Sequence, residues 1–262
     1  MVDGRYVYGL VPGSALERAP ILAGVDSARP VELVCEGGIC ALVSRVDVDR
    51  FDEQPLRERL ADMDWVERTA RRHQEVIDAV LTECTPIPMR LCTVYRDESS
   101  LRRMLDEQQD DLLAALTDLG GKLEWGVQAF RTSGTAAPPS RAGGHGETTA
   151  SGADYLWTRL GQQRAAERAE ADIGRACEEL HETLSALAVA ARLGPPQRAE
   201  ASGRDAPMVM NAFYLVANED RERFTRRTAQ LGSGLAPRGV ALRVTGPWAP
   251  YSFVPAAVGG AR

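Results

Sequence analysis

The sequence predicts an α+β fold in two domains, with antiparallel or mixed sheets and long amphipathic helices. β-rich runs alternate with long helical runs along the 262 residues, and one pair of β-rich runs indicates a hairpin. The strand–helix alternation and the hairpin together favour ferredoxin-like packing. We expect two domains, an N-terminal α+β domain over residues 1–120 and a C-terminal domain over residues 121–262.

The first β-rich runs end at glycine or proline. Residues 5–11 are rich in β-branched and aromatic side chains and stop at Pro12-Gly13, which predicts a first strand. Two further runs, 31–35 and 39–46, are separated by Glu36-Gly37-Gly38, where glycine tolerates the positive φ of a tight turn. The sheet is therefore expected to be at least partly antiparallel.

Helical periodicity dominates the rest of the first domain. Apolar residues recur at helical spacing from Leu56 to Cys84, and again over residues 97–119 up to Gly120-Gly121, which provides a stop. Between these helices, Pro86-Ile87-Pro88 cannot be helical at its start. We expect an edge strand over residues 86–95, entered through prolines.

The second half repeats this alternation. Residues 123–129 alternate as in a half-buried strand, and residues 155–191 predict one long helix whose first half is strongly charged. A buried strand over 209–217, an amphipathic helix over 219–231 and a strand over 240–245 complete the predicted elements.

Two segments lack the apolar residues that would offset the entropy of ordering them. Residues 132–152 are rich in Ser, Thr, Gly, Ala and Pro, and residues 194–207 form a second Gly/Pro/polar break. We expect disordered loops at both places.

Charge and hydropathy favour a cytoplasmic protein with protein partners. The net charge is −6, so no general excess of positive charge would drive binding to nucleic acid or an anionic membrane. The N-terminus has no signal-peptide pattern, and no run approaches the length of an apolar membrane span.

The five cysteines form an odd set without zinc-ligand spacing. Cys35 and Cys40 flank the predicted hairpin turn, which would let them meet across it. Because a reducing cytosol disfavours a bond, we expect all five cysteines to be reduced thiols.

No residue pattern predicts catalysis, a cofactor or a metal. The three histidines lack catalytic or ligand spacing, Gly120-Gly121-Lys122 lacks the rest of a phosphate loop, and Gly232-Ser233-Gly234 follows a helix rather than a strand. Carboxylate clusters such as Asp106-Glu107 leave a small carboxylate-based enzyme as one alternative, and a ferredoxin-like ligand-sensing regulatory module is another.

Several short motifs without catalytic logic follow one another along nearly the whole chain. They are Pro88-Met89-Arg90 with Thr93, Glu124 after Gly120-Gly121-Lys122, Ser151-Gly152-x-x-Tyr155-Leu156, Asn211-Ala212-x-Tyr214-Leu215-Val216 and Gly246-Pro247-Trp248-x-Pro250-Tyr251-x-Phe253. In this order they resemble the gas vesicle protein F/L family. Leu91-Cys92, where an aromatic and a glycine are expected, and Ala249, where a proline is common, are mild departures.

The resemblance implies two α+β domains, the second a modified ferredoxin fold. It implies a non-enzymatic accessory protein of gas vesicle assembly, in the cytoplasm and at the gas vesicle, without a cofactor. Its partners would be the hydrophobic wall protein and other accessory proteins. The resemblance does not distinguish the F from the L form.

The terminal motif carries Trp248, Tyr251 and Phe253 on a chain stiffened by Pro247 and Pro250. Large aromatic side chains anchor interfaces, but they also fill protein cores. Because Gly246-Pro247-Trp248 continues a predicted strand, we expect these aromatics to dock the tail within the molecule.

The Pro88-Met89-Arg90 motif has the same ambiguity between a structural role and contact with a partner. We expect Arg90 to form a salt bridge with Glu124 across neighbouring strands rather than to touch another protein.

Overall fold

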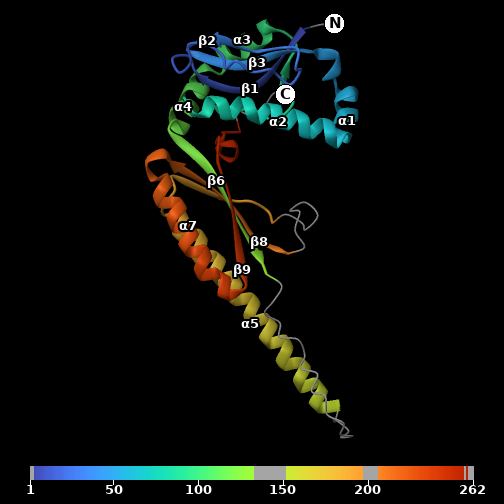
Figure 1. Ribbon diagram of the computed structural model, residues 1–262, viewed down its shortest axis with the longest axis vertical. Helices are drawn as coiled ribbons and strands as arrows, with labels where there is room; N and C mark the ends of the chain where they lie inside the picture. The colour runs from blue at the N-terminus through green and yellow to red at the C-terminus, as the bar shows by residue number, and fades with distance from the viewer. Residues whose placement is uncertain (1–2, 133–151, 197–205, 257, 259–262) are drawn as a thin grey trace. The chain divides into compact units, whose positions relative to one another are not determined.

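Residues 3–132, 152–196, 206–256 and 258 are described by a computed structural model (Figure 1). The chain folds into two compact units, the first comprising Met1–Glu124 with Gly246–Arg262 and the second Trp125–Thr245. Helices and sheets in both units confirm the predicted α+β class. The chain leaves the first unit after Glu124 and returns to it at Gly246. The two predicted domains, by contrast, are each one continuous segment.

The sheet of the first unit is built around β1 (Asp3–Pro12). β3 (Ile39–Asp47) pairs antiparallel with β1, and β2 (Val31–Glu36) pairs antiparallel with β3. On its other side β1 pairs with β4 (Ile87–Pro88) and β5 (Val94–Tyr95). The single edge strand expected over 86–95 is therefore wrong, because the chain turns between these strands.

The predicted hairpin is confirmed between β2 and β3. Gly37 and Gly38 form its turn with φ angles of 56° and 82°, which glycine adopts without a side-chain clash. The register pairs Glu36 with Ile39 and Cys35 with Cys40.

Each long helix predicted in the first unit is two helices. The first is α1 (Glu53–Ala61) and α2 (Met63–Leu81), because the Asp62 carboxylate caps α2 by accepting from the backbone N–H groups of Asp64 and Trp65 at 3.0 and 3.2 Å. The second is α3 (Glu98–Glu107) and α4 (Gln109–Leu119), which meet at Gln108. Figure 1 shows α2 along one face of the sheet and α3 on the other.

The core between the sheet and α2 contains polar groups that bind one another. The Tyr8 hydroxyl lies 2.7 Å from Ser44 Oγ, and the Tyr6 hydroxyl lies 3.0 Å from His73 Nδ1. All four residues are buried. Burial lowers the pKa of His73 to about 4, so this imidazole is neutral at pH 7.

The second unit is a sheet with two helices on one face (Figure 1). In chain order it contains β6 (Lys122–Arg131), α5 (Gly152–Ser185), β7 (Ala190–Leu193), β8 (Met208–Ala217), α7 (Arg221–Leu235) and β9 (Val240–Trp248). The strands lie in the order β7-β8-β6-β9. This is the β-α-β-β-α-β element order of ferredoxin-like units, and the ferredoxin-like assignment itself stays a prediction.

The helix predicted over residues 155–191 extends too far. α5 ends at Ser185, and Ala190–Leu193 form β7, which pairs antiparallel with β8. The Val189 N–H already donates to the Leu215 carbonyl at 2.8 Å, so hydrogen bonds to a distant strand replace the local helical pattern. Most of the two loops expected to be disordered lies outside the described residues.

The expectation that all five cysteines are reduced is wrong for one pair. Cys35 and Cys40 form a disulfide between the paired ends of β2 and β3, whereas Cys84, Cys92 and Cys177 are free thiols. The register between β2 and β3 places the two cysteines directly opposite each other, within bonding distance. The expectation of reduced thiols rested on cellular redox conditions and did not take this pairing into account.

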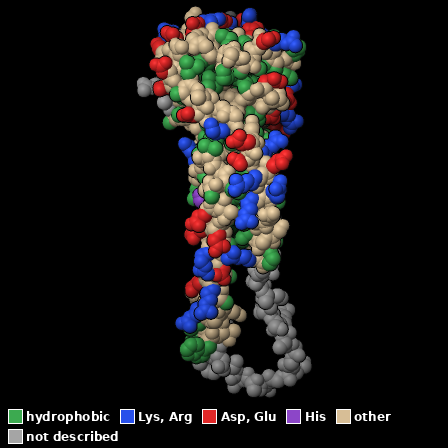
Figure 2. All heavy atoms as spheres, turned by 90° about the vertical axis from the view of Figure 1, so that its left-hand side faces the viewer, with side chains coloured by type: hydrophobic (Ala, Val, Ile, Leu, Met, Phe, Trp, Pro, Cys, Tyr) green, Lys and Arg blue, Asp and Glu red, His purple; other side chains and the backbone are tan. Residues whose placement is uncertain are grey.

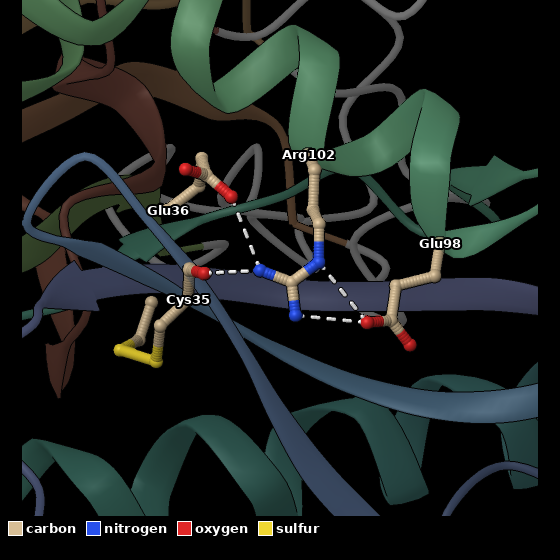
Figure 3. The surroundings of a disulfide bond; sticks show 5 residues. Cys35, Glu36, Glu98 and Arg102 are labelled. Atoms are coloured by element: carbon tan, nitrogen blue, oxygen red, sulfur yellow. Dashed lines mark hydrogen bonds and ion pairs between the residues drawn. A yellow bond between two sulfur atoms is a disulfide. The ribbon is translucent and has the colours of Figure 1, made fainter.

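Arg102 holds the same hairpin against α3 (Figure 3). Its guanidinium donates to the Cys35 carbonyl at 2.5 Å, to Glu36 Oε2 at 3.1 Å and twice to Glu98 Oε1 at 2.9 and 3.1 Å. The bonds from Arg102 to Glu98 are the main cause of a lowered pKa of Glu98, and a bond from Arg5 lowers it further. The hairpin is therefore stabilised by the disulfide and by the hydrogen bonds and ion pairs of Arg102.

The disulfide predicts the number of reactive thiols. Without reductant, the denatured protein should expose the three free thiols, and after reduction all five cysteines should react with a thiol reagent. Cys35→Ser should give the same count before and after reduction. Five reactive thiols in unreduced protein would contradict the bond.

Acid should destabilise the first unit through His73. Its unfolded pKa is 6.5 and its folded pKa about 4, so the unfolded state binds the extra proton between these values. The free energy of unfolding should fall by about 3 kcal/mol as pH falls through this window. Denaturant titrations at pH 7 and 4.5 measure this loss, and an equal loss in His73→Gln would contradict the assignment.

Candidate protein-interaction site

The terminal motif Gly246–Phe253 lies in the first unit, where its small and rigid residues enter the core. Ala249 is fully buried in the cluster that contains Tyr6, Tyr8 and Val76. Pro250 is also buried, and Phe253 is 7% exposed. The tail is thus part of the folded core of this unit.

Glu124 binds the tail through both carboxylate oxygens. The Ser252 N–H donates to Oε2 at 2.6 Å, and the Ser252 hydroxyl donates to Oε1 at 2.8 Å. Glu124 is only 5% exposed, so these charge-assisted bonds compensate for removing the carboxylate from water.

Backbone hydrogen bonds shape the motif into a compact turn. The Tyr251 N–H donates to the Ala249 carbonyl at 2.8 Å, and the Phe253 N–H donates to the Pro250 carbonyl at 3.0 Å. The 3-10 helix over Tyr251–Phe253 begins directly after Pro250. This turn directs Phe253 into the core.

Two aromatic residues of the motif remain accessible to solvent. Trp248 is 38% exposed and Tyr251 is 39% exposed. The Tyr251 hydroxyl donates to Gln74 Oε1 on α2 at 3.2 Å, which orients the ring. The expected docking therefore describes Phe253 but not Trp248, because the chain enters the core only at Ala249 and Pro250.

The Pro88-Met89-Arg90 motif lies beside β1. Pro88 is buried opposite Gly9, and the buried Met89 donates its N–H to the Tyr8 carbonyl at 2.8 Å. Arg90 is exposed, and its carbonyl accepts from the Thr93 hydroxyl at 2.8 Å.

The expected salt bridge between Arg90 and Glu124 is wrong. Among the residues that the structure describes, Arg90 forms no ion pair, whereas Glu124 binds Ser252. The buried run over residues 85–89 ends at Met89, and Arg90 is exposed just after it.

The remaining motif residues belong to the second unit. Tyr214 is fully buried, and its hydroxyl lies 2.9 Å from His181 Nδ1 on α5, so it serves the core. Leu156 is 59% exposed on α5, and the side chain of Tyr155 lies outside the described part of the chain.

Sequence reasoning missed the two polar residues that fix the tail. Ser252 stands at a position that the terminal motif leaves unspecified, and Gln74 is a half-buried residue of α2 directly after the buried His73. The alternation predicted over residues 123–129 places Glu124 on the face opposite the apolar side chains, so the sequence contained no signal that this carboxylate is buried and bound by Ser252.

The described residues contain no group of three or more His, Cys, Asp or Glu placed to hold a metal ion, and no helix among them is long and apolar enough to cross a membrane. The carboxyls of Asp97 and Glu98 have lowered pKa values, because Ser100 and Arg102 bind their charged forms.

Fold and site together define a two-unit α+β protein whose C-terminal motif closes the first unit and exposes aromatic side chains. The model of the gas vesicle synthesis protein GvpL/GvpF family matches residues 4–255. The chain therefore belongs to the GvpL/GvpF family, as the order of its motifs indicated.

Individual gas vesicle proteins are similar to this chain over most of their length. The chain is 40% identical to gas vesicle protein L of Streptomyces sp. (strain CB03234), covering 86% of this chain and 83% of that protein. It is 25% identical to gas vesicle protein F of Haloferax mediterranei, covering 99% and 97%.

A solved structure supports the fold. The crystal structure of gas vesicle protein GvpF from Anabaena sp. PCC7120 matches with a TM-score of 0.67 at 20% identity, covering 99% of both chains. At this identity the likeness shows the shared fold alone.

Truncating the two aromatics should separate their roles. Phe253→Ala should lower the free energy of unfolding by about 3–5 kcal/mol, as expected for a buried large-to-small change. Trp248→Ala should cost less than about 1 kcal/mol, because its side chain is already partly solvated. Denaturant unfolding of both variants measures this difference, and equal losses would contradict the division of the motif into buried and exposed residues.

Proposed function

We propose that this chain is a non-enzymatic accessory protein of gas vesicle assembly that binds the hydrophobic wall protein and other accessory proteins. The single observation that carries the proposal is the family match over residues 4–255, which includes nearly the whole chain and the terminal motif. The site of action would be the cytoplasm and the growing gas vesicle.

The physical need for such a partner follows from the chemistry of the wall. A wall protein that presents an apolar face to gas has an exposed hydrophobic surface before it assembles, and such surfaces aggregate. A folded partner that covers this surface would keep the wall protein available for assembly.

The terminal motif offers a surface of suitable chemistry. Trp248 and Tyr251 combine large apolar rings with a polar edge, the residue types that dominate interface energetics. Their backbone is held by the buried Pro250 and by the Ser252 bonds to Glu124, so little conformational entropy remains to be lost on binding. We infer that these two side chains contact the wall protein.

The alternatives have less support. A carboxylate-based enzyme needs a general acid with a raised pKa, whereas hydrogen bonds lower the pKa of Asp97 and of Glu98. A ligand-sensing module would use the ferredoxin-like second unit, but the polar core pair Tyr214–His181 is already satisfied internally.

A binding assay with matched variants tests the proposal. Trp248→Ala and Tyr251→Ala should each weaken binding of the wall protein by about 2 kcal/mol, roughly thirtyfold, while the melting temperature changes little. Purified wild type and variants would be titrated against wall protein kept in solution by a solubilising fusion partner.

Ile21→Ala provides the control, since Ile21 is an apolar side chain of the same unit with 89% exposure. It should bind like the wild type. Wild-type protein that shows no binding would overturn the proposed function, and binding that survives both aromatic substitutions would overturn the assignment of the surface.

A further inference from the structure

The first half of α5 extends beyond the packed part of its own unit. Every side chain from Leu156 to Asp172 is exposed, and Ile173 is the first buried residue of the helix. At 1.5 Å per residue, this stretch measures roughly 25 Å. Figure 2 shows hydrophobic side chains gathered at the described end of this helix and charged side chains along it.

A helical stretch of this length that packs against no neighbour is unusual. Isolated helices of this length are marginal in water, because most helical stability in proteins comes from packing one face against a neighbour. The side-chain bonds of this stretch include those from Gln163 to Glu167 at 3.1 Å and from Arg131 to Glu170 at 2.8 Å. Trp157 is 69% exposed and Leu160 is 45% exposed.

These apolar side chains belong to a seam along one face of the helix. Its positions are separated alternately by three and four residues, the spacing that two packed helices require. We call this set the α5 seam: Trp157, Leu160, Arg164, Glu167, Ala171 and Gly174. All six are exposed, and the buried residues Ile173, Cys177 and Leu180 lie on a different face.

The α5 seam is complementary to itself when it is read in the reverse direction. In an antiparallel pair related by a two-fold axis between Ala165 and Ala166, the bulky Trp157 and Leu160 meet the small Gly174 and Ala171. In the same register Arg164 meets Glu167, so each copy contributes one cation and one carboxylate to two equivalent ion pairs.

The structure leaves room for this arrangement. A side chain added at Gly174 would meet no atom within 4 Å, so space for a partner's Trp157 is open there. Within the described part of the chain, Arg164 forms no ion pair, and Glu167 bonds only to the neutral Gln163 amide. The charges at the centre of the seam are therefore available to a second copy.

We propose that the α5 seam is a homodimerisation surface, with α5 of one copy packed antiparallel against α5 of another. Size, charge and spacing select the same register independently of one another. This surface lies in the second unit, whereas the aromatics Trp248 and Tyr251 belong to the first. The pairing therefore does not depend on the proposed contact with the wall protein.

Charge reversal provides the decisive test on the full chain. Sedimentation equilibrium of the wild type should show a monomer–dimer equilibrium. Arg164→Glu alone and Glu167→Arg alone should each weaken dimerisation at least about tenfold, because both ion pairs become repulsions. An equimolar mixture of the two variants should dimerise like the wild type, since each new charge then meets its opposite.

A steric variant tests the register. Gly174→Leu should abolish the dimer by occupying the space for Trp157, without harming the fold, because leucine favours a helix more than glycine does. Gly234→Leu is its control, since Gly234 is an exposed glycine of α7 that also has nothing within 4 Å.

Three results would overturn the proposal. They are a wild-type chain that stays monomeric up to about 100 μM, a concentration at which even weak specific pairs associate, a mixture of reversed variants that stays monomeric, and a dimer unaffected by Gly174→Leu. A seam that binds only the wall protein would appear as the first of these.

Discussion

The bond between Glu124 and Ser252 is the constraint on which the first unit depends. The chain leaves this unit after Glu124, forms the whole second unit, and returns at Gly246. The last residue before departure therefore binds a residue just after the return, through a backbone N–H at 2.6 Å and a hydroxyl at 2.8 Å. Because the carboxylate is 5% exposed, weakening these bonds would carry the desolvation penalty of a buried charge. The tail is thereby fixed as a structural element rather than as a loose end.

This constraint lets one short motif serve two purposes. Ala249, Pro250 and Phe253 face the core, while Trp248 and Tyr251 face solvent from the same turn. A rigid backbone anchored by its buried residues presents the exposed rings in fixed positions, which lowers the entropic cost of recognition. The structural role of the motif thus falls on its buried residues, and the binding role proposed for Trp248 and Tyr251 would fall on other side chains.

The second unit divides one helix in a similar way. The C-terminal half of α5 supplies Ile173, Cys177, Leu180 and Leu184 to its core, whereas the preceding half carries the α5 seam. The core contacts of the C-terminal half fix the helix. They thereby stabilise the helical conformation of the exposed half, which would be only marginally stable in water by itself. If both proposals hold, a dimer would present two wall-protein surfaces at once, which raises effective affinity without any new contact.

The sequence by itself determined the fold class, the β2–β3 hairpin and the family, because these rest on local periodicity, on glycine in the turn and on the motifs. It did not reveal that Asp62 ends one helix and caps the next, that residues 190–193 pair with β8 instead of continuing α5, or that Cys35 bonds to Cys40. From the sequence we expected Arg90 to bind Glu124, whereas in the structure Ser252 binds this carboxylate. Only the tertiary structure decided these points, because each depends on which distant group reaches a given atom, and a local pattern contains no such information.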